Sequence, residues 1–411
     1  MPGPRSDPFH VEVALIGSVP KLSVRQLALA GKRVFLRADF NVPIDAGTVA
    51  DDTRLRAVLP TIRYCLDAGA SIVLASHLGR PGGRPDPQYS LAPVAARLGE
   101  LLSMSVPLAP DCVGAVTEAR AQALALGQVM LLENLRFHPE EEANDPEFAR
   151  SLARLADCYV TDAFAAAHRA QASIDAITRF LQPAAAGLLM ERELAELGRL
   201  LEHPERPLLA ILGGAKVSDK LALVEQLLTR VDALAIGGAM AFTFLRAFGH
   251  DVGRSLVEPN LVEAARRTLA EGRRRGVRIA LPVDAVVAEG LDSARGYAVS
   301  IREIPSGLMA LDIGPTTAQQ FGDLVRSART VVWNGPMGVF ERWPFAEGTL
   351  GVATAVAGMH GFSVVGGGDT IAAVQRAGVA DRIGYLSTGG GAFLEFLEGR
   401  KLPGVEALTD A

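Results

Sequence analysis

Short apolar runs alternate along this chain with longer segments of helical spacing. The apolar runs predict strands at Arg33–Arg37, Ser71–Ala75, Val129–Leu132, Cys158–Thr161, Leu208–Leu212, Ala233–Ile236, Arg278–Leu281, Thr330–Trp333 and Ser363–Val365. The spacing between them predicts helices over Leu55–Ala68, Ser90–Leu102, Pro146–Ala156, Lys216–Thr229, Leu261–Gly272 and Thr316–Arg326. This alternation is typical of an α/β fold whose parallel sheets are covered on both faces. Ligands of such sheets bind beyond the carboxyl ends of the strands, so the loops after the strands are where we expect the chemistry.

The length of the chain and the position of its prolines predict two domains. A length of 411 residues exceeds one comfortable core and fits two domains of about 200 residues each. We expect the break near Gln182–Pro207, where an alanine-rich stretch leads into the helical pattern Met190–Glu202, which prolines then end. A helix linking two lobes is the favoured interpretation. The alternative is one more surface helix on a single large sheet.

Composition narrows the class of protein. Hydrophobic residues make up 49% and charged residues 21%, and the net charge of −5 gives no reason to expect a nucleic-acid or membrane partner. The three cysteines, Cys65, Cys112 and Cys158, are widely spaced without a C-x-x-C motif, so we expect small buried residues rather than a disulfide framework or zinc site. The Pro-rich start lacks a signal-peptide pattern and predicts a disordered extension over residues 1–20. A cytoplasmic enzyme fits these features.

Four loops of the second half share one design, in which a strand is followed by glycines and the start of a helix. They are Gly213-Gly214, Gly237-Gly238, Asn334-Gly335-Pro336-Met337-Gly338 and Gly366-Gly367-Gly368-Asp369-Thr370, and Glu341 follows the third. Glycine lets backbone N–H groups approach phosphate oxygens, and the N-terminus of a helix adds partial positive charge. One such loop could be a plain turn from strand to helix, but four in one lobe indicate phosphate binding.

Lysine is rare in this chain, and two of its lysines follow the first glycine loop. Of 41 basic residues only five are lysine, and Lys216 and Lys220 stand four positions apart. A lysine is a compact, mobile charge that can follow a phosphoryl group, whereas arginine presents a broad fork. If both residues lie on the predicted helix, their spacing places them on one face, where both can point at one ligand.

Familiar nucleotide motifs are absent from the sequence. Neither G-x-x-x-x-G-K-[ST] nor a helix-opening G-x-G-x-x-G occurs, which disfavours P-loop ATPases and ordinary dinucleotide dehydrogenases. Asp369 is the best candidate for a Mg²⁺ ligand, because Mg²⁺ in phosphate sites usually takes one or two carboxylates plus phosphate oxygens. The alternative role for Asp369 is a simple cap of the following helix.

The first half instead places cationic side chains where strands end. The predicted members of this cationic cluster are Arg54, Arg80, Arg136 and Arg169, together with His77 and His168. Arginine forks bind phosphate and carboxylate in two-point fashion. Any one of these arginines could be a solvated surface charge, but their joint position at strand ends indicates an anion site.

Together these segments resemble phosphoglycerate kinase. The motifs that carry the resemblance are R-A-D-F-N-V-P, S-H-L-G-R-P, L-L-E-N-L-R-F-H, G-G-A-K-V-S-D-K, W-N-G-P-M-G-V-F-E, G-G-G-D-T and S-T-G-G-G-A, and they run in order from about Lys21 to the C-terminus. The resemblance implies two Rossmann-like lobes joined by a hinge helix. It assigns 21–184 to a lobe that binds 3-phosphoglycerate or 1,3-bisphosphoglycerate, 185–206 to the helix, 207–398 to a lobe that binds ADP or ATP with Mg²⁺, and 399–411 to a return onto the first lobe.

The resemblance also implies residue roles, matched motif by motif. The substrate contacts fall on Asp39, Asn41, Arg54, His77, Arg80, Arg136 and Arg169. The nucleotide contacts fall on Gly213, Gly214, Lys216, Lys220, Asn334, Glu341, Gly367, Gly368, Asp369 and Thr370, with Asp369 on the metal. Catalytic roles are expected for Arg54, Lys216, Gly367 and Gly368. Small departures from the family pattern occur at Thr161, Ala165 and Gln171.

The chemistry implied needs no general base, since an anionic ADP oxygen displaces a carboxylate from an acyl phosphate. Catalysis then consists of positioning and charge neutralisation, and we expect the lobes to close during turnover. We expect a monomer that takes small-molecule partners. Two alternatives stay open: a catalytically silent binding protein on the same fold, and a kinase of another small carboxylate.

Overall fold

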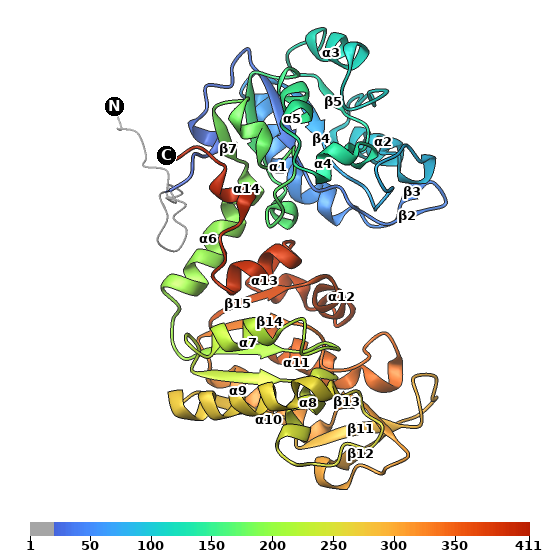
Figure 1. Ribbon diagram of the computed structural model, residues 1–411, viewed down its shortest axis with the longest axis vertical. Coiled ribbons are helices and arrows are strands. Elements are labelled where there is room, and N and C mark those ends of the chain that lie inside the picture. Colours follow the sequence, from blue (N-terminus) through green and yellow to red (C-terminus); the bar gives the residue numbers. More distant parts are fainter. Residues whose placement is uncertain (1–19) are drawn as a thin grey trace. The chain divides into compact units, whose positions relative to one another are not determined.

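The computed structural model describes residues 20–411 and divides them into two compact units (Figure 1). The first unit runs to Gly198 and also contains Lys401–Ala411, and the second comprises Arg199–Arg400. The division falls inside helix α6 (Leu188–Glu202). Apart from Pro20, the predicted extension 1–20 lies outside the described residues.

The first unit is built on a five-stranded parallel sheet in the order β5-β4-β1-β6-β7. Its strands are β1 (Arg33–Arg37), β4 (Ser71–Ala75), β5 (Val129–Leu131), β6 (Cys158–Thr161) and β7 (Ala184–Ala186), and a short hairpin adds β2 (Ile44–Asp45) and β3 (Thr48–Val49). Its helices are α1 (Thr53–Asp67), α2 (Ala92–Leu102), α3 (Ala115–Gln122), α4 (Pro139–Glu142), α5 (Pro146–Ala153) and α14 (Pro403–Glu406). Every residue of β4 is buried, as expected for a strand covered on both faces.

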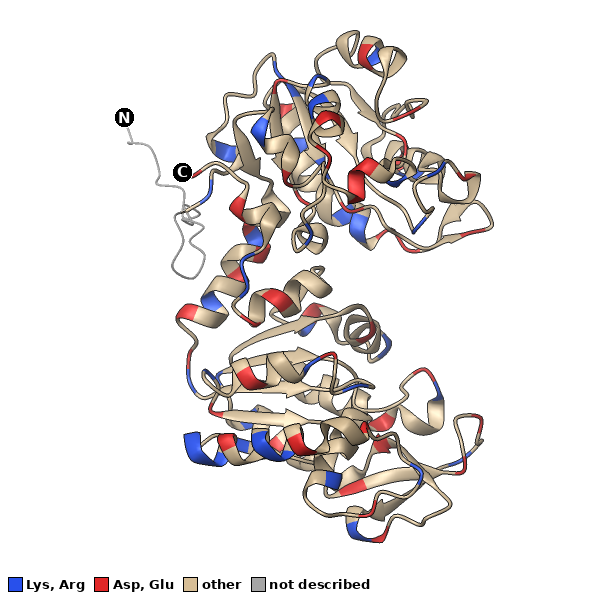
Figure 2. Cartoon of the chain, in the orientation of Figure 1, with Lys and Arg blue, Asp and Glu red and all other residues tan. Residues whose placement is uncertain are grey.

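The second unit contains a six-stranded parallel sheet in the order β10-β9-β8-β14-β15-β16. Its strands are β8 (Leu208–Leu212), β9 (Ala233–Ile236), β10 (Arg278–Ala280), β14 (Thr330–Asn334), β15 (Phe362–Gly366) and β16 (Tyr385–Ser387). Its helices are α7 (Leu221–Leu227), α8 (Met240–Ala247), α9 (Val262–Arg275), α10 (Pro315–Ser327), α11 (Glu347–Ala357), α12 (Gly368–Arg376) and α13 (Gly391–Leu397). No charged residue occurs in β8, β9, β14 or β15, which Figure 2 shows as tan arrows.

Each unit has its own apolar core. In the first unit Leu36 and Leu74 pack with Ile62 of α1, and in the second Trp333 and Val365 pack with Phe321 of α10. The parallel α/β architecture expected from the sequence is therefore confirmed. No helix among residues 20–411 is both long and apolar enough to cross a membrane.

The sequence missed the elements that break the strand–helix alternation. The second unit carries an antiparallel sheet of β11 (Asp284–Ala288), β12 (Tyr297–Ser300) and β13 (Met309–Ile313) in the order β12-β11-β13. The first unit gains the edge strand β7, whose three alanines are all buried. Alanine has low strand propensity, so its pairing here depends on the tertiary contacts rather than on local preference.

The predicted helix Lys216–Thr229 is wrong at its start, because α7 begins only at Leu221. Residues 216–220 form a loop and turn, so Lys216 and Lys220 do not share a helix face. The amides of Val217 and Ser218 donate to Oε2 of Glu258 instead of serving a helix. Ser and Asp at 218 and 219 favour such turns because their side chains compete for backbone groups.

The C-terminal segment packs against the edge of the first sheet (Figure 1). The amide of Thr409 donates to the carbonyl of Ala184 in β7 at 2.9 Å, and the amide of Leu22 donates to the carbonyl of Thr409 at 2.8 Å. Lys21 is 8% exposed, and its Nζ donates to two carbonyls of the segment, those of Glu406 and Leu408. It also pairs with Asp410 at 2.8 Å. One buried ammonium group thus ties the last residues to the start of the described chain.

We predict that Lys21→Met speeds hydrogen exchange at the amides of Leu22 and Thr409. The lost ammonium leaves buried carbonyls without a donor, which should lower the free energy of local opening by about 1.5–3 kcal/mol. Exchange of the full chain measured by NMR or mass spectrometry checks this. The matched control is Lys401→Met, which removes an exposed ion pair with Glu406 worth about 0–1 kcal/mol. Equal exchange in both variants would contradict the role given to Lys21.

Candidate active site

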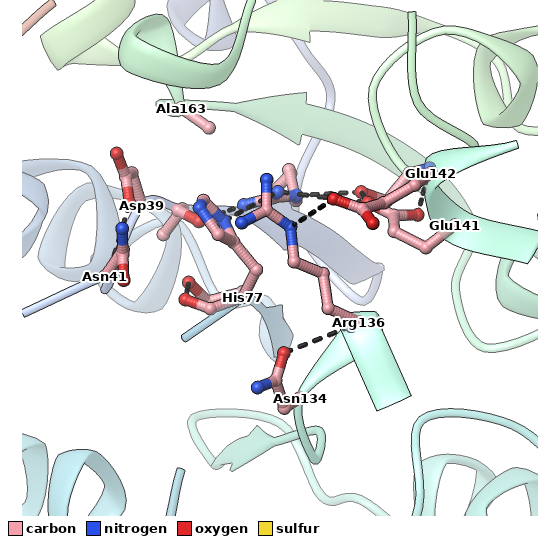
Figure 3. A network of polar contacts seen from close by, with 12 residues as sticks. Asp39, Asn41, His77, Asn134, Arg136, Glu141, Glu142 and Ala163 are labelled. Carbon is pink, nitrogen blue, oxygen red and sulfur yellow. Dashed lines mark hydrogen bonds and ion pairs between the residues drawn. The ribbon is translucent and has the colours of Figure 1, made fainter. Parts of the chain in front are cut away.

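The loops after β1 and β4 bring the predicted substrate residues Asp39, Asn41 and His77 together (Figure 3). The Asn41 amide donates to Oδ1 of Asp39 at 3.0 Å, and the Asn41 side-chain oxygen accepts from the amide of Gly79 at 2.9 Å. Arg54, from the first turn of α1, donates to Oδ2 of Asp39 at 2.8 Å and to the carbonyl of Asn41 at 3.2 Å. Parallel strands end at the same edge of a sheet, which is why residues distant in sequence meet here.

Behind this loop pair lies a fully buried arginine, Arg37, at the end of β1. Its Nε donates to Oγ of Ser173 at 2.8 Å, and its Nη1 donates to the carbonyl of Ala38. Its Nη2 lies 3.2 Å from Nδ1 of His77. Since arginine carries only donors, Nδ1 of His77 must accept. The proton of the neutral His77 ring is then on Nε2, which is left as a donor.

The electrostatics at the strand ends keep His77 neutral and Asp39 charged. Burial lowers the pKa of His77 to about 3; the charge of Asp39 opposes this fall, and those of Arg37, Arg136 and Arg54 add to it. Burial opposes ionisation of Asp39, yet the charges of Arg54 and Arg37 and the amide of Asn41 hold the pKa of Asp39 below its usual value. Asp39 therefore stays a carboxylate that orients Arg54.

Glu141 of α4 is the buried counter-charge of Arg37. Its carboxylate lies 3.9 Å from the guanidinium and accepts from the amide of Ser173 at 2.9 Å and from its Oγ at 2.5 Å. Burial raises the pKa of Glu141, and Arg37 and Ser173 counteract that rise. Sequence reasoning assigned no role to Arg37, Glu141 or Ser173. The available signal was an arginine that ends an apolar strand of a buried sheet.

Arg136, on the short helix η3 (Leu135–Phe137), is a further predicted residue that joins this cluster (Figure 3). It is 5% exposed, donates to the carbonyl of Gly79 at 2.9 Å and pairs with Glu142 at 3.3 Å. Burial lowers the pKa of Arg136, and the nearby charges of Arg37 and Arg169 lower it further. Arg169, which is exposed, is thus near enough to belong to the same cationic cluster, and its Nε donates to Nε2 of His168. Arg80 is exposed and has no hydrogen bond or ion pair among residues 20–411, so the structure does not bring it into contact with the others.

In the second unit the four glycine loops meet at the carboxyl edge of the large sheet. Their backbones bond to one another: Gly213 N–H to Asn334 O at 2.9 Å, Gly214 N–H to Pro336 O at 3.0 Å, Gly238 N–H to Met337 O at 3.1 Å and Met240 N–H to Gly214 O at 3.0 Å. The fourth loop joins through side chains, since Asn334 donates to Gly366 O at 2.7 Å and Thr370 accepts from Gly335 N–H at 2.7 Å. The sequence could show four similar loops but not that they form one connected surface.

Two of these glycines are required by close approach. A Cβ on Gly213 would lie 2.1 Å from the carbonyl oxygen of Pro336, and one on Gly238 would lie 2.5 Å from the amide of Gly214. Gly238 also has a φ of +65°, which favours glycine. At Gly368, in contrast, a Cβ would meet nothing within 4 Å, so its backbone borders open space.

Lys220 is held at the junction of the loops. Its Nζ donates to the carbonyls of Gly213 at 2.5 Å and Asn334 at 3.3 Å. Burial lowers the pKa of Lys220 to about 8, while Asp219 and Asp369 oppose that fall. Asp369, in the first turn of α12, is exposed and close enough to Lys220 to act on its charge.

Lys216 and Glu341, by contrast, are exposed, and neither makes a hydrogen bond or ion pair in the described part of the chain. The charge of Lys216 helps to hold the pKa of Glu258 below its usual value, which places Lys216 near the loop amides of Val217 and Ser218. Among residues 20–411, no hydrogen bond or ion pair joins Glu341 to the lysines or to the glycine loops.

Sequence reasoning also missed Asp312 of β13, a buried carboxyl beside these loops. It accepts from the amides of Gly348 at 2.7 Å and Ile313 at 2.9 Å. Burial raises the pKa of Asp312 to about 8 against the effect of these amides. A Cβ on Gly338 would lie 2.2 Å from its carboxyl oxygen, so Asp312 fixes the end of the third glycine loop. An Asp in a buried strand was the available signal.

Comparison with known proteins bears on both units. The family model of phosphoglycerate kinase matches residues 24–400. The chain is 56% identical over 391 residues to a phosphoglycerate kinase of Moorella thermoacetica, covering 95% of this chain and 99% of that one. It is 55% identical over 401 residues to one of Acidobacterium capsulatum, covering 95% and 99%.

Solved structures agree. The phosphoglycerate kinase of Coxiella burnetii matches with a TM-score of 0.86 at 42% identity, and that of Pyrococcus horikoshii with 0.84 at 37%, each covering 94% of this chain and 98% of the other. The family match over nearly the whole length, the high identity to relatives and the two-lobed α/β structural neighbours all indicate the same family. The chain belongs to the phosphoglycerate kinase family.

Proposed function

We propose that this chain catalyses reversible, Mg²⁺-dependent transfer of a phosphoryl group from 1,3-bisphosphoglycerate to ADP, giving 3-phosphoglycerate and ATP. The observation that carries the proposal is a pair of separate anion-binding constellations within a member of the phosphoglycerate kinase family. The first unit offers a preformed cluster of arginines and histidine, and the second offers glycine-loop amides with two lysines.

The cationic cluster suits a phosphorylated acid. Arg54 and Arg136 are oriented by Asp39 and Glu142, and His77 has a donor N–H on Nε2. Guanidinium forks match carboxylate and phosphate oxygens, and pre-orientation reduces the entropy lost when a ligand binds. We assign the substrate contacts to Asp39, Asn41, Arg54, His77, Arg80, Arg136 and Arg169, of which Arg80 has the least structural support.

The glycine loops suit nucleotide phosphates. Their contacts are assigned to Gly213, Gly214, Lys216, Lys220, Asn334, Glu341, Gly367, Gly368, Asp369 and Thr370, of which Glu341 rests on the motif match alone. Asp369 fits a Mg²⁺ ligand, because it is an exposed carboxylate at the start of α12 and no ion pair occupies it within residues 20–411. A bound Mg²⁺ would neutralise charge on the phosphate oxygens.

The reaction can proceed by positioning and charge neutralisation. An oxygen of the ADP β-phosphate forms a bond to the acyl-phosphate phosphorus as the bond to the carboxyl oxygen breaks, and the carboxylate leaves with that electron pair. The nucleophile is already anionic and the leaving group is a weak base, so no residue must take a proton. We assign Arg54 and Lys216, with the amides of Gly367 and Gly368, to the charge on the transferring group.

The two alternatives explain less. Lys216 is exposed and makes no hydrogen bond or ion pair among the described residues, beside the amides of Val217 and Ser218 that Glu258 holds. A silent binding protein would have no use for such a lysine. A kinase of a small unphosphorylated carboxylate would not need several arginines around one site. We also propose that the chain takes small-molecule partners, is a monomer and is located in the cytoplasm.

The proposed function predicts phosphoryl-transfer activity directly. Purified protein with ADP, Mg²⁺ and 1,3-bisphosphoglycerate should form ATP in a coupled assay, and the reverse reaction should accept 3-phosphoglycerate but not acetate or aspartate. The cationic cluster demands a substrate that already carries a phosphate. No ATP above background would refute the proposed function, and turnover of acetate would favour the other kinase.

A second prediction concerns Lys216. Lys216→Ala should lower kcat by about 10²–10³-fold with only a modest change in ADP affinity, because Lys216 acts on charge that develops in the transition state. Steady-state kinetics with separately measured ADP binding check this. Lys32→Ala, which removes another exposed lysine, serves as the control. Equal losses in binding and rate would show that Lys216 only anchors the nucleotide.

A third prediction follows from the lowered pKa of Lys220. As pH rises through about 8, Lys220 of the free enzyme loses its charge, so kcat/KM for ADP should fall, approaching tenfold per pH unit. Lys220→Arg keeps its charge in this range, so its fall should be shallower whatever its absolute activity. Circular dichroism verifies that both proteins stay folded. Parallel profiles would mean that another group titrates.

A further inference from the structure

A mixed cluster of metal-binding side chains lies in the first unit, apart from the residues assigned above. Asp111 and Cys112 lie in the loop before α3, and His138 lies between η3 and α4. One ligand atom from each residue can be chosen so that all three lie within 4.8 Å of one another. Nε2 of His138 lies 2.7 Å from Oδ1 of Asp111.

The backbone holds these three residues in place. The amide of Cys112 donates to Oδ1 of Asp111 at 2.6 Å, and buried Thr117 donates from Oγ1 to the carbonyl of Asp111 at 3.0 Å. His138 is fixed on both sides, since its amide donates to Leu135 O and its carbonyl accepts from the amide of Glu141, each at 3.2 Å. Its ring also stacks on Phe148 at 5.2 Å between centroids. Little rearrangement is therefore needed for the three groups to act together.

The exposure of the three side chains is graded. Cys112 is fully buried, whereas the side chains of His138 and Asp111 are 27% and 48% exposed. An ion bound among them would have protein on the thiol side and water on the carboxylate side. That arrangement, three protein ligands with one position left to solvent, is the one found in open zinc sites.

The donor set selects the class of ion. Thiolate, imidazole and carboxylate all bind Zn²⁺ at about 2.0–2.3 Å, whereas Mg²⁺ prefers oxygen and does not suit a thiol. Ligand atoms of a tetrahedral site are then about 3.3–3.8 Å apart, which is compatible with the observed cluster. The contact between Asp111 and His138 would have to open by somewhat less than 1 Å, a change within reach of two half-exposed side chains.

We propose that Asp111, Cys112 and His138 bind a divalent transition-metal ion of the zinc class. This site is distinct from the Mg²⁺ position proposed at Asp369, and it does not depend on the proposed function. The absence of a C-x-x-C motif led us to expect no zinc site. That motif, however, describes ligands that are close in sequence, whereas these ligands come from two separate loops. The competing explanation is a simple hydrogen bond between Asp111 and His138 beside an inert buried thiol.

Cobalt(II) distinguishes these explanations in the full-length protein. Co²⁺ replaces Zn²⁺ in such sites, and a thiolate ligand gives a charge-transfer band in the near ultraviolet. We expect this band on titration of the apo protein and its displacement by Zn²⁺. The band should be absent in Cys112→Ser and unchanged in Cys65→Ser and Cys158→Ser, which remove the other two buried thiols. His138→Gln should weaken cobalt binding at least about tenfold.

Two results would overturn the proposal: no charge-transfer band in the parent protein, or a band retained in Cys112→Ser. If Cys112→Ser fails to fold, the partly exposed ligands decide. Weaker cobalt binding in both Asp111→Asn and His138→Gln then supports the site, and unchanged binding in both refutes it. Circular dichroism of each variant shows that a lost band does not reflect unfolding.

Discussion

The first unit depends on the burial of one positive charge, the guanidinium of Arg37. An uncompensated buried charge is costly, so Arg37 requires the buried carboxylate of Glu141 and the hydroxyl of Ser173. Its Nη2 is directed at Nδ1 of His77, which sets the tautomer of that ring. The same charge helps to keep His77 neutral and Asp39 ionised. The buried charge of Arg37 thus acts on the ionisation of His77 and Asp39, and Asp39 in turn orients Arg54.

In the second unit, the loops proposed to bind phosphate meet at a largely buried cation, Lys220, which bonds to backbone carbonyls. Its glycine loops bond to one another through backbone groups, and Lys220 closes the junction by bonding the carbonyls of Gly213 and Asn334. Neutral carbonyls satisfy the buried ammonium only in part, which is why its pKa falls to about 8. A phosphate placed there would restore the missing counter-charge. We therefore assign anion binding to arginine forks in the first unit, and to backbone amides with a partly desolvated lysine in the second.

Much of the fold could be predicted from the sequence, because most strands of the two parallel sheets are apolar runs, several of them next to a glycine. Among the elements that escaped prediction, β7 and β16 are each only three residues long, and β11–β13 interrupt the alternation. The start of the helix at Lys216 was predicted wrongly. The amides of Val217 and Ser218 donate to Glu258, and hydrophobic periodicity cannot reveal a partner so far along the chain. For the same reason, the roles of Glu141, Asp312 and His138 could not be seen in the sequence. Each acts through partners that only the tertiary structure supplies.

The different environments of Lys216 and Lys220 suit the two different roles assigned to them, Lys216 to the transferring phosphoryl group and Lys220 to the nucleotide. Lys220 is tied by two carbonyls, so moving it would cost hydrogen bonds and disturb the loop junction. Lys216 is exposed, and no hydrogen bond or ion pair holds its side chain within residues 20–411. A group that must adjust as a phosphoryl group moves needs this freedom, whereas a group that defines where a phosphate rests needs constraint. The two lysines four residues apart therefore do not share a helix face; they place one bonded and one exposed charge at the same loop.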